Sequence, residues 1–182
     1  DGVATTQRTF TVNVASVNDA PTLDAIADVN INEDAGLQTV NLSGISTGAL
    51  NETQTLTVTA VSSNTSIIPN PTVTYTSPTA TGSIRFTPVA NAYGSANVTV
   101  TVSDGVTSTP RTFAVNGAGV NDAPVAGFTG STVSGTGPLS VTFTNTSSDI
   151  DNAVSTLTWS WNFGDGVGTS AAQSPTYVFN KA

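Results

Sequence analysis

The chain has 182 residues, of which 37% are apolar and 9% charged, and it carries a formal net charge of −8 with no cysteine, methionine or histidine. This apolar content can form compact cores, but the absence of cysteine excludes a disulfide framework. The acidic balance excludes a phosphate-binding stripe, and no apolar run approaches the ~18 residues of a membrane span, so we expect neither a nucleic-acid partner nor membrane insertion.

The first segment in chain order, Asp1 to Thr22, recurs as Asp104 to Val125 at an offset of 103 residues without a gap. Each copy contains Val-Asn-Asp-Ala-Pro near its end. A repeat of this length predicts tandem modules. We therefore expect residues 1–17 to be the last strand of a preceding module, 18–122 to be one complete module, and 123–182 to be a further module truncated at its C-terminus. The chain is expected to be a fragment of a longer protein.

The complete module alternates apolar and hydroxyl side chains with a period of two, which is typical of strands with one buried face. Gly, Pro and Asn turn residues separate the runs. About seven short strands in about 100 residues predict an all-β fold of tandem immunoglobulin-like antiparallel β-sandwich modules in an extended array. Phe86, Tyr93 and Phe113 are expected as core or corner residues. The predicted strands are residues 28–32, 37–42, 54–62, 72–76, 83–89, 96–103 and 111–116.

The segment after Val125 has a different composition, with a long turn-rich connection between two predicted strands, residues 139–145 and 156–163. Phe163 to Gly166 reads Phe-Gly-Asp-Gly and predicts a tight hairpin turn, because Asp-Gly is a preferred turn pair.

Two families resemble these modules. Pro21 to Pro124 resembles the bacterial cadherin-like tandem repeats of giant secreted and surface adhesins, on "NEDAG", "FTPVANAYGSANVTVTVSDG" and the closing "VNDAP". The last portion resembles a PKD domain, on "GPLSVTFTNTS", "WSWNFGDG" and "SPTYVF". The second resemblance implies that Trp161 and Phe163 face inward. Both imply an extracellular location, secreted or attached to the cell surface, and neither implies catalysis.

The cadherin-like resemblance also implies a calcium site at the module junctions. Calcium takes six to eight oxygen ligands from carboxylates, amides and carbonyls. By this resemblance Asp104 faces the upstream linker and Glu33 the downstream one, although "VANAYG" (residues 89–94) lacks the acids expected there. The alternative is a metal-free joint, in which Asn and Asp cap turns and Pro fixes the chain direction. The candidate ligands are Asn18, Asp19, Asp104, Glu33, Asn121 and Asp122.

The absence of histidine and cysteine excludes the usual acyl-transfer triads and thiol nucleophiles. Asp149 and Asp151 are interpreted as solvated loop residues, so we expect no enzyme. The predicted role is a stalk or shaft segment of a long extracellular bacterial repeat protein, with its own neighbouring modules as partners. The predicted strand Arg8 to Val14 could also add to an open sheet edge of a second copy, giving head-to-tail self-association.

Two other functions remain open from the sequence. The modules could be spacers in a secreted polysaccharide- or protein-degrading enzyme. They could also bind surface glycans directly, for which Trp159 and Tyr177 are the candidate aromatic residues.

Overall fold

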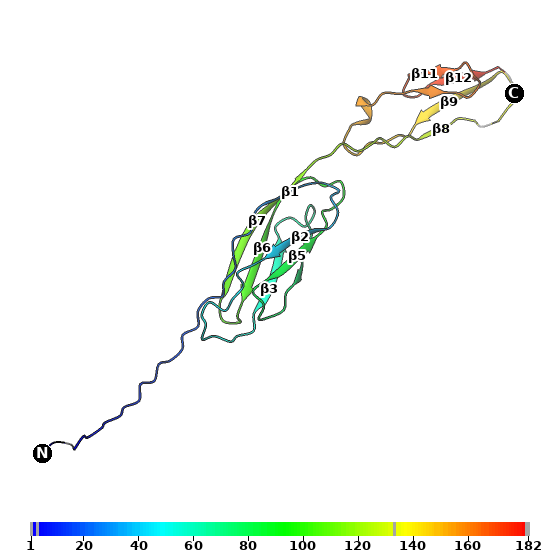
Figure 1. Cartoon of the computed structure of the whole chain (residues 1–182). Coiled ribbons are helices and arrows are strands. Elements are labelled where there is room, and N and C mark those ends of the chain that lie inside the picture. Colours follow the sequence, from blue (N-terminus) through cyan, green and yellow to red (C-terminus); the bar gives the residue numbers. More distant parts are fainter. Residues whose placement is uncertain (1, 3, 133, 181–182) are drawn as a thin grey trace. The chain divides into compact units, whose positions relative to one another are not determined.

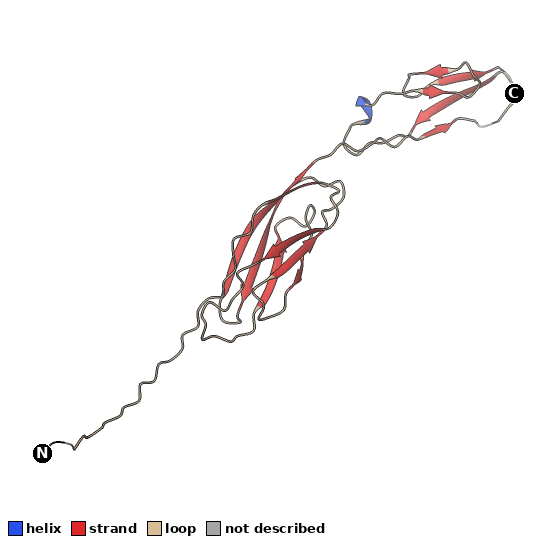
Figure 2. Ribbon diagram, viewed as in Figure 1, coloured by secondary structure: helices blue, strands red, loops and turns tan. Residues whose placement is uncertain are grey.

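The computed structural model describes residues 2, 4–132 and 134–180, and the chain divides into two compact units, residues 1–119 and 120–182 (Figure 1). Among the described residues the regular structure is strand, apart from one short 3-10 helix, η1 (Val154–Thr156) (Figure 2). None of the described helices is long and apolar enough to cross a membrane. The prediction of an all-β chain with tandem immunoglobulin-like sandwiches is confirmed.

The described part of the first unit forms two sheets that together make an immunoglobulin-like sandwich. One sheet has the order β1-β7-β6-β3, with β1 parallel to β7 and the other pairs antiparallel. The second sheet has the order β2-β5-β4 and is antiparallel throughout. Each predicted strand of the complete module overlaps one of these: β1 (Val29–Asn32), β2 (Gln38–Leu42), β3 (Thr57–Ser62), β4 (Thr72–Thr74), β5 (Gly82–Phe86), β6 (Gly94–Ser103) and β7 (Ser108–Ala118).

The core of this unit follows from the period-two pattern, because alternate side chains of a strand point to opposite faces. In β6 the side chains of Val98, Val100 and Val102 are completely buried. On the opposite face, the hydroxyls of Thr99 and Thr112 form a hydrogen bond of 2.9 Å between β6 and β7. The hydroxyl-bearing residues therefore cover the outer face of the sheet while valines fill the interior.

The three aromatic residues expected in the core or at a corner have different environments. Phe86 and Phe113 are buried, as expected. Tyr93 is exposed, because it lies in the turn just before β6 rather than within a strand. A Cβ added at Gly119 would lie 3.4 Å from Cγ of Tyr93, so the tyrosine ring packs over the backbone at Gly119. Tyr93 therefore occupies a corner and not the core.

The N-terminal segment, residues 4–16, is drawn as loop and forms no strand among the described residues (Figure 2). It includes the predicted strand Arg8 to Val14. Phe10 and Val14 are each 88% exposed. A segment with the sequence of a sandwich strand therefore has its apolar side chains in solvent.

The described residues of the second unit form a three-stranded antiparallel sheet with the order β12-β9-β8, together with the hairpin β10-β11. Predicted strand 139–145 corresponds to β9. Predicted strand 156–163 is shorter than expected: Thr156 belongs to η1, where its hydroxyl donates to the carbonyl of Ala153, residues 157–160 are irregular, and only Trp161–Asn162 forms a strand. The strands are β8 (Phe128–Gly130), β9 (Leu139–Asn145), β10 (Trp161–Asn162), β11 (Thr169–Ser170) and β12 (Thr176–Phe179).

The predicted hairpin turn joins β10 to β11, although its loop is longer than a two-residue turn. Asp165 organises this loop, since its Oδ1 accepts hydrogen bonds from the backbone N–H groups of Val167 (3.1 Å) and Gly168 (2.7 Å). Gly164 and Gly166 both have φ of +83°, a left-handed conformation that glycine adopts without steric cost.

Candidate functional site

The first Val-Asn-Asp-Ala-Pro motif is held by hydrogen bonds to the module that follows it. The side-chain Nδ2 of Asn18 donates to Oδ2 of Asp104 (2.9 Å) and to the carbonyl of Asp19 (3.1 Å). The Oδ1 of Asn18 accepts a hydrogen bond from Nε2 of Gln54 (2.8 Å). The backbone N–H of Asp19 donates to Oε1 of Glu52 (2.7 Å). We call these five residues the first junction clamp.

The second motif is held in the same way within the second unit. The Nδ2 of Asn121 donates to the carbonyl of Asp122 (2.8 Å), and the Oδ1 of Asn121 accepts from Nδ2 of Asn152 (3.0 Å). The backbone N–H of Asp122 donates to Oδ2 of Asp151 (2.5 Å). These four residues are the second junction clamp, in which Asp151 and Asn152 take the roles of Glu52 and Gln54.

Asp104 lies in the β6–β7 turn and is surrounded by donors. Its Oδ1 accepts from the backbone N–H groups of Val106 and Thr107, both at 2.7 Å, and its Oδ2 accepts from the hydroxyl of Thr107 (3.0 Å) as well as from Asn18. The backbone N–H of Thr107, the amide of Asn18 and the backbone N–H of Val106 hold the pKa of the Asp104 carboxyl far below its usual range. Asp104 therefore stays ionised and ties the turn to the linker.

Glu33, which the resemblance assigns to the downstream linker, lies at the opposite end of the same sheet from Asp104. Its backbone N–H donates to the carbonyl of Ala118 (2.8 Å), the last residue of β7, and its side chain is buried. Asp104 comes just before β7, an eleven-residue strand, so about 30 Å separates the two positions. The first unit thus has Asn18, Asp19 and Asp104 at one end and Glu33 at the other.

Calcium binding remains a prediction. The structure brings Asn18, Asp19 and Asp104 together, but the atom of Asn18 nearest to Asp104 is its amide nitrogen, a donor that does not bind a cation. Among residues 2, 4–132 and 134–180 no group of three or more Asp, Glu, His or Cys is arranged to hold a metal ion. However, Oε2 of Glu52 and Oε1 of Gln54 are buried and accept no hydrogen bond from described residues. Two such oxygens have the capacity to accept a hydrogen bond from a water or to coordinate a cation.

The sequence did not point to Glu52, Gln54 and Asn152 as partners of the linker. They come from loops of different sequence, Glu-Thr-Gln in one module and Asp-Asn in the other. The shared signal is an acid followed closely by an amide, which is too common to single out. Asp149, predicted as a solvated loop residue, caps this loop because its Oδ1 accepts from the backbone N–H groups of Asp151 (2.9 Å) and Asn152 (2.8 Å).

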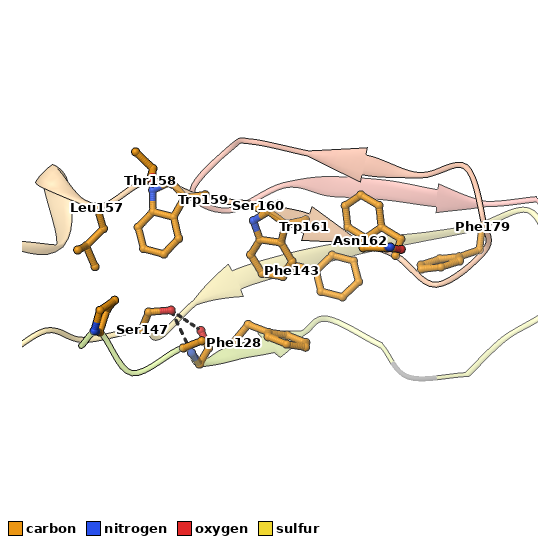
Figure 3. Close-up of a pocket in the computed structure, with 14 residues that line it drawn as sticks. Phe128, Phe143, Ser147, Leu157, Thr158, Trp159, Ser160, Trp161, Asn162 and Phe179 are labelled. Atoms are coloured by element: carbon orange, nitrogen blue, oxygen red, sulfur yellow. Dashed lines mark hydrogen bonds between the residues drawn. The ribbon is translucent and has the colours of Figure 1, made fainter. Parts of the chain in front are cut away.

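A row of aromatic rings fills the space between the sheet and the hairpin of the second unit (Figure 3). Trp161 and Phe163, expected to face inward, both contact the ring of Phe143, with centroids 5.5 Å and 5.3 Å away. Tyr177, a candidate glycan-binding residue, instead stacks on Phe163 at 4.1 Å. Its hydroxyl donates to Oδ2 of Asp165, and this bond lowers the pKa of Asp165 and raises that of Tyr177.

Beside this row the sheet and the hairpin enclose a cleft with a volume of about 660 Å³. Trp159 and Trp161 line one side and project toward the strands that carry Phe143 and Phe128 (Figure 3). A second hollow of about 430 Å³ is also lined by Phe128 and Phe143 and lies near β8 and β9.

Residues 121–182 match the family model of the PKD domain, which agrees with the expected resemblance for this part of the chain. No curated protein matches the chain. Among solved structures, it is similar to titin domains Z1Z2 in complex with telethonin, at 11% identity over 92% of this chain and 84% of that one, with a TM-score of 0.42. Surface-layer protein SbsC domains 4 and 5 match at 20% identity over 54% and 46%, with a TM-score of 0.35. The endo-fucoidan hydrolase MfFcnA4 matches at 18% identity over 59% of this chain and 16% of that enzyme, with a TM-score of 0.41.

Proposed function

We propose that the chain is a structural spacer, a non-catalytic stretch of the stalk of a long extracellular bacterial repeat protein such as a surface adhesin. The observation that carries this proposal is the repeated junction clamp. In both units the Asn-Asp pair of the linker is fixed to the module that follows by the same two kinds of hydrogen bond, and the Asn amide also donates to the carbonyl of the Asp beside it. Because a fixed linker residue loses conformational freedom, the clamp shortens the flexible part of each joint.

The surface and the composition support the same role. Exposed hydroxyls pair across the strands in both units, as for Thr142 and Thr176 at 3.1 Å. The stability of a module with such a surface depends little on ionic strength, because few charged side chains contribute to it. PKD and immunoglobulin-like domains commonly act as spacer or adhesion modules, and the match of residues 121–182 to a PKD domain is consistent with that use.

The test is a replacement experiment in the parent protein on intact cells. Residues 17–119 are either deleted or replaced by an unrelated immunoglobulin-like module of similar length. A spacer supplies length and stiffness rather than a binding surface, so the replacement should keep surface display and adhesion, whereas the deletion should reduce the reach of the distal part. If the replacement abolishes adhesion as completely as removal of the adhesive domain does, the spacer role is wrong.

The same replacement bears on the first of the two functions left open by the sequence. Spacers of a secreted degradative enzyme would tolerate it in the same way, but the parent protein would then show catalytic activity. The replacement leaves Trp159 and Tyr177 in place, so direct carbohydrate binding needs a separate test. Trp159→Ala in the 182-residue chain, assayed on a glycan array, addresses this directly, because Trp159 is half-buried and lines the cleft.

A further inference from the structure

β3 (Thr57–Ser62) is an edge strand of the first unit, because within the described residues it pairs with β6 alone. Its sequence is rich in β-branched residues and contains no charged residue, proline or glycine. Edge strands of native proteins usually carry a charge, a proline or a bulge that prevents pairing with another chain. β3 has none of these, since its register with β6 is also continuous. Its own sequence therefore leaves the edge open to a further strand.

The pairing with β6 fixes which backbone groups of this strand point outward. The N–H of Ser63 donates to the carbonyl of Asn97 in β6 (2.8 Å). Along an antiparallel strand, residues that bond to the partner strand alternate with residues whose backbone groups point away from it. The N–H and C=O groups of Ser62 and of every second residue before it therefore face away from β6. These outward residues are Leu56, Val58, Ala60 and Ser62.

Two side chains cap the ends of this outward edge. The backbone N–H of Ser62 donates to Oδ1 of Asn70 (2.9 Å), and the backbone N–H of Leu56 donates to the hydroxyl of Ser77 (3.1 Å). Both contacts are partly buried, which strengthens them against replacement by water. Asn70 and Ser77 flank β4, and the pairing of β4 with β5 holds that connection in place. We call these two residues the edge caps; they belong to the same module as β3.

The edge caps occupy the groups that a second copy of β3 would need. Two copies can pair antiparallel through their outward edges with Thr59 opposite Thr59. In this register Val58 lies opposite Ala60 of the second copy, and their outward groups pair with no strand in the part of the chain that the structure describes. Leu56 lies opposite Ser62, and the N–H groups of both are taken by the caps. The caps therefore remove the outer half of the possible ladder.

The exposed side chains of β3 are compatible with the same register. The side chains of Thr57, Thr59 and Val61 face solvent, and Val61 is 56% exposed. Thr57 would lie opposite Val61 of the second copy, and no charged side chains would meet. Pairs of β-branched residues across neighbouring strands stabilise a sheet. Locally, the edge caps are the feature that opposes self-pairing.

We propose that Asn70 and Ser77 keep the first unit from pairing through β3, and that β3 pairs antiparallel with β3 of a second copy once these caps are removed. Each copy then offers the outward groups of Leu56 and Ser62 in addition to those of Val58 and Ala60. Because both copies use the same surface, the contact is isologous and stops at a dimer. This inference goes beyond the spacer role and does not depend on it.

Sedimentation velocity of the 182-residue chain at increasing concentration tests the role of the caps. The double variant Asn70→Ala/Ser77→Ala should form dimers with a dissociation constant at least about tenfold lower than that of the wild type, because further backbone hydrogen bonds become possible. The matched control is Asn64→Ala, which removes another asparagine between β3 and β4. Its Oδ1 accepts from the backbone N–H of Ser66 (3.2 Å) and not from β3, so this variant should behave like the wild type.

A charge at the centre of the predicted contact separates strand pairing from association of unfolded chains. Thr59→Lys, added to the double variant, places two positive charges directly opposite each other, and like charges in that position destabilise a strand pair. The side chain of Thr59 is exposed, so the substitution should leave the fold intact and abolish the dimer. Thr101→Lys is the control: Thr101 lies beside Thr59 on the same face, but in the central strand β6, and it should leave the dimer in place.

A cysteine scan tests the register. The chain has no cysteine, so each variant carries a single thiol. In the predicted register Thr59 forms a non-hydrogen-bonded pair with its own copy, with a Cα–Cα distance of about 4.5 Å that a disulfide can span. Thr59→Cys in the double variant should therefore give a covalent dimer on mild oxidation. Thr57→Cys should give far less, because Thr57 faces Val61 of the second copy.

Three results would overturn the proposal. The wild type and the double variant could show the same association, which would mean that the caps do not control it. The double variant could associate equally well with Thr59→Lys, which would place the contact elsewhere or trace it to unfolding. Thr57→Cys could cross-link as readily as Thr59→Cys, which would exclude the register.

Discussion

The most direct test of the junction clamp is the substitution Asn18→Ala. In the native structure the Asn18 side chain makes hydrogen bonds to Asp104, Gln54, Thr107 and the carbonyl of Asp19. Neutral hydrogen bonds contribute about 1 kcal/mol each, and partly buried partners left unpaired add to the cost. Since the Asp19 and Thr107 contacts are exposed and solvent replaces them easily, we expect the free energy of unfolding of the first unit to fall by about 2–3 kcal/mol.

The position of the tryptophans allows this loss to be assigned to one unit. Both tryptophans lie in the second unit, so tryptophan fluorescence follows unfolding of that unit, while calorimetry follows both. A loss of 2–3 kcal/mol in a unit of this size lowers its midpoint by about 10 °C. Asn18→Ala should shift the first unit's transition and leave the fluorescence transition in place. Asn121→Ala should do the reverse.

The matched control is Asn41→Ala, an exposed asparagine in β2. It should change the first unit's stability by less than about 0.5 kcal/mol. Equal midpoints for Asn18→Ala and Asn41→Ala would refute the reasoning, because the linker would then be held by something other than its asparagine. A loss of the fluorescence transition in Asn18→Ala would equally contradict a clamp that acts within one unit.

Three further predictions follow from the same contacts. Phe113→Ala should destabilise the first unit by about 3–5 kcal/mol in denaturant unfolding, whereas the repeat-equivalent Phe10→Ala should have no effect on the monomer, because only Phe113 is buried; equal effects would show that the N-terminal segment is packed. The first unit should lose stability on acidification below about pH 4, because the folded state holds the pKa of Asp104 below its unfolded value and favours the ionised form. Asp104→Asn should remove this part of the pH dependence of the unfolding midpoint. An unchanged pH profile in the variant would exclude Asp104 as the source of that dependence. Millimolar calcium must raise the first unit's midpoint if the ion binds the native state, and Asn18→Asp should gain more than the wild type because a carboxylate replaces the amide beside Asp104; no shift in either protein would end the calcium hypothesis.

The strands of the first unit were predictable because its sequence alternates strictly. Val98, Val100 and Val102 are separated by threonines, and burial follows the period of two along β6. The second unit was harder to predict, since Thr156 joins a helical turn through a local hydrogen bond that competes with strand pairing. That turn accounts for Thr156 alone; residues 157–160 are irregular, and β10 spans two residues where a longer strand was expected.

Only part of the candidate site, the linker residues and Asp104, was predictable from the sequence. The repeat identified Asn18 and Asn121, and the family resemblance pointed to Asp104. The hydrogen-bonding partners on the following module could not be predicted from the sequence, because Glu52 lies 33 residues beyond Asp19, whereas Asp151 lies 29 residues beyond Asp122. Contacts of this kind depend on how loops fold back onto the linker, and neither spacing nor residue identity repeats.

The clamps also define where such a chain can be cut and rejoined. Each linker is fastened to the module on its C-terminal side, so the transferable cassette begins at the linker and runs, for the first unit, from Val17 to Gly119. In two modules of different sequence, an acid and an amide of one loop form hydrogen bonds to the same Asn-Asp linker. Splicing at Val17 or Val120 therefore keeps each linker together with the loop residues that bind it. Chimeras joined there should fold without redesign of the joint.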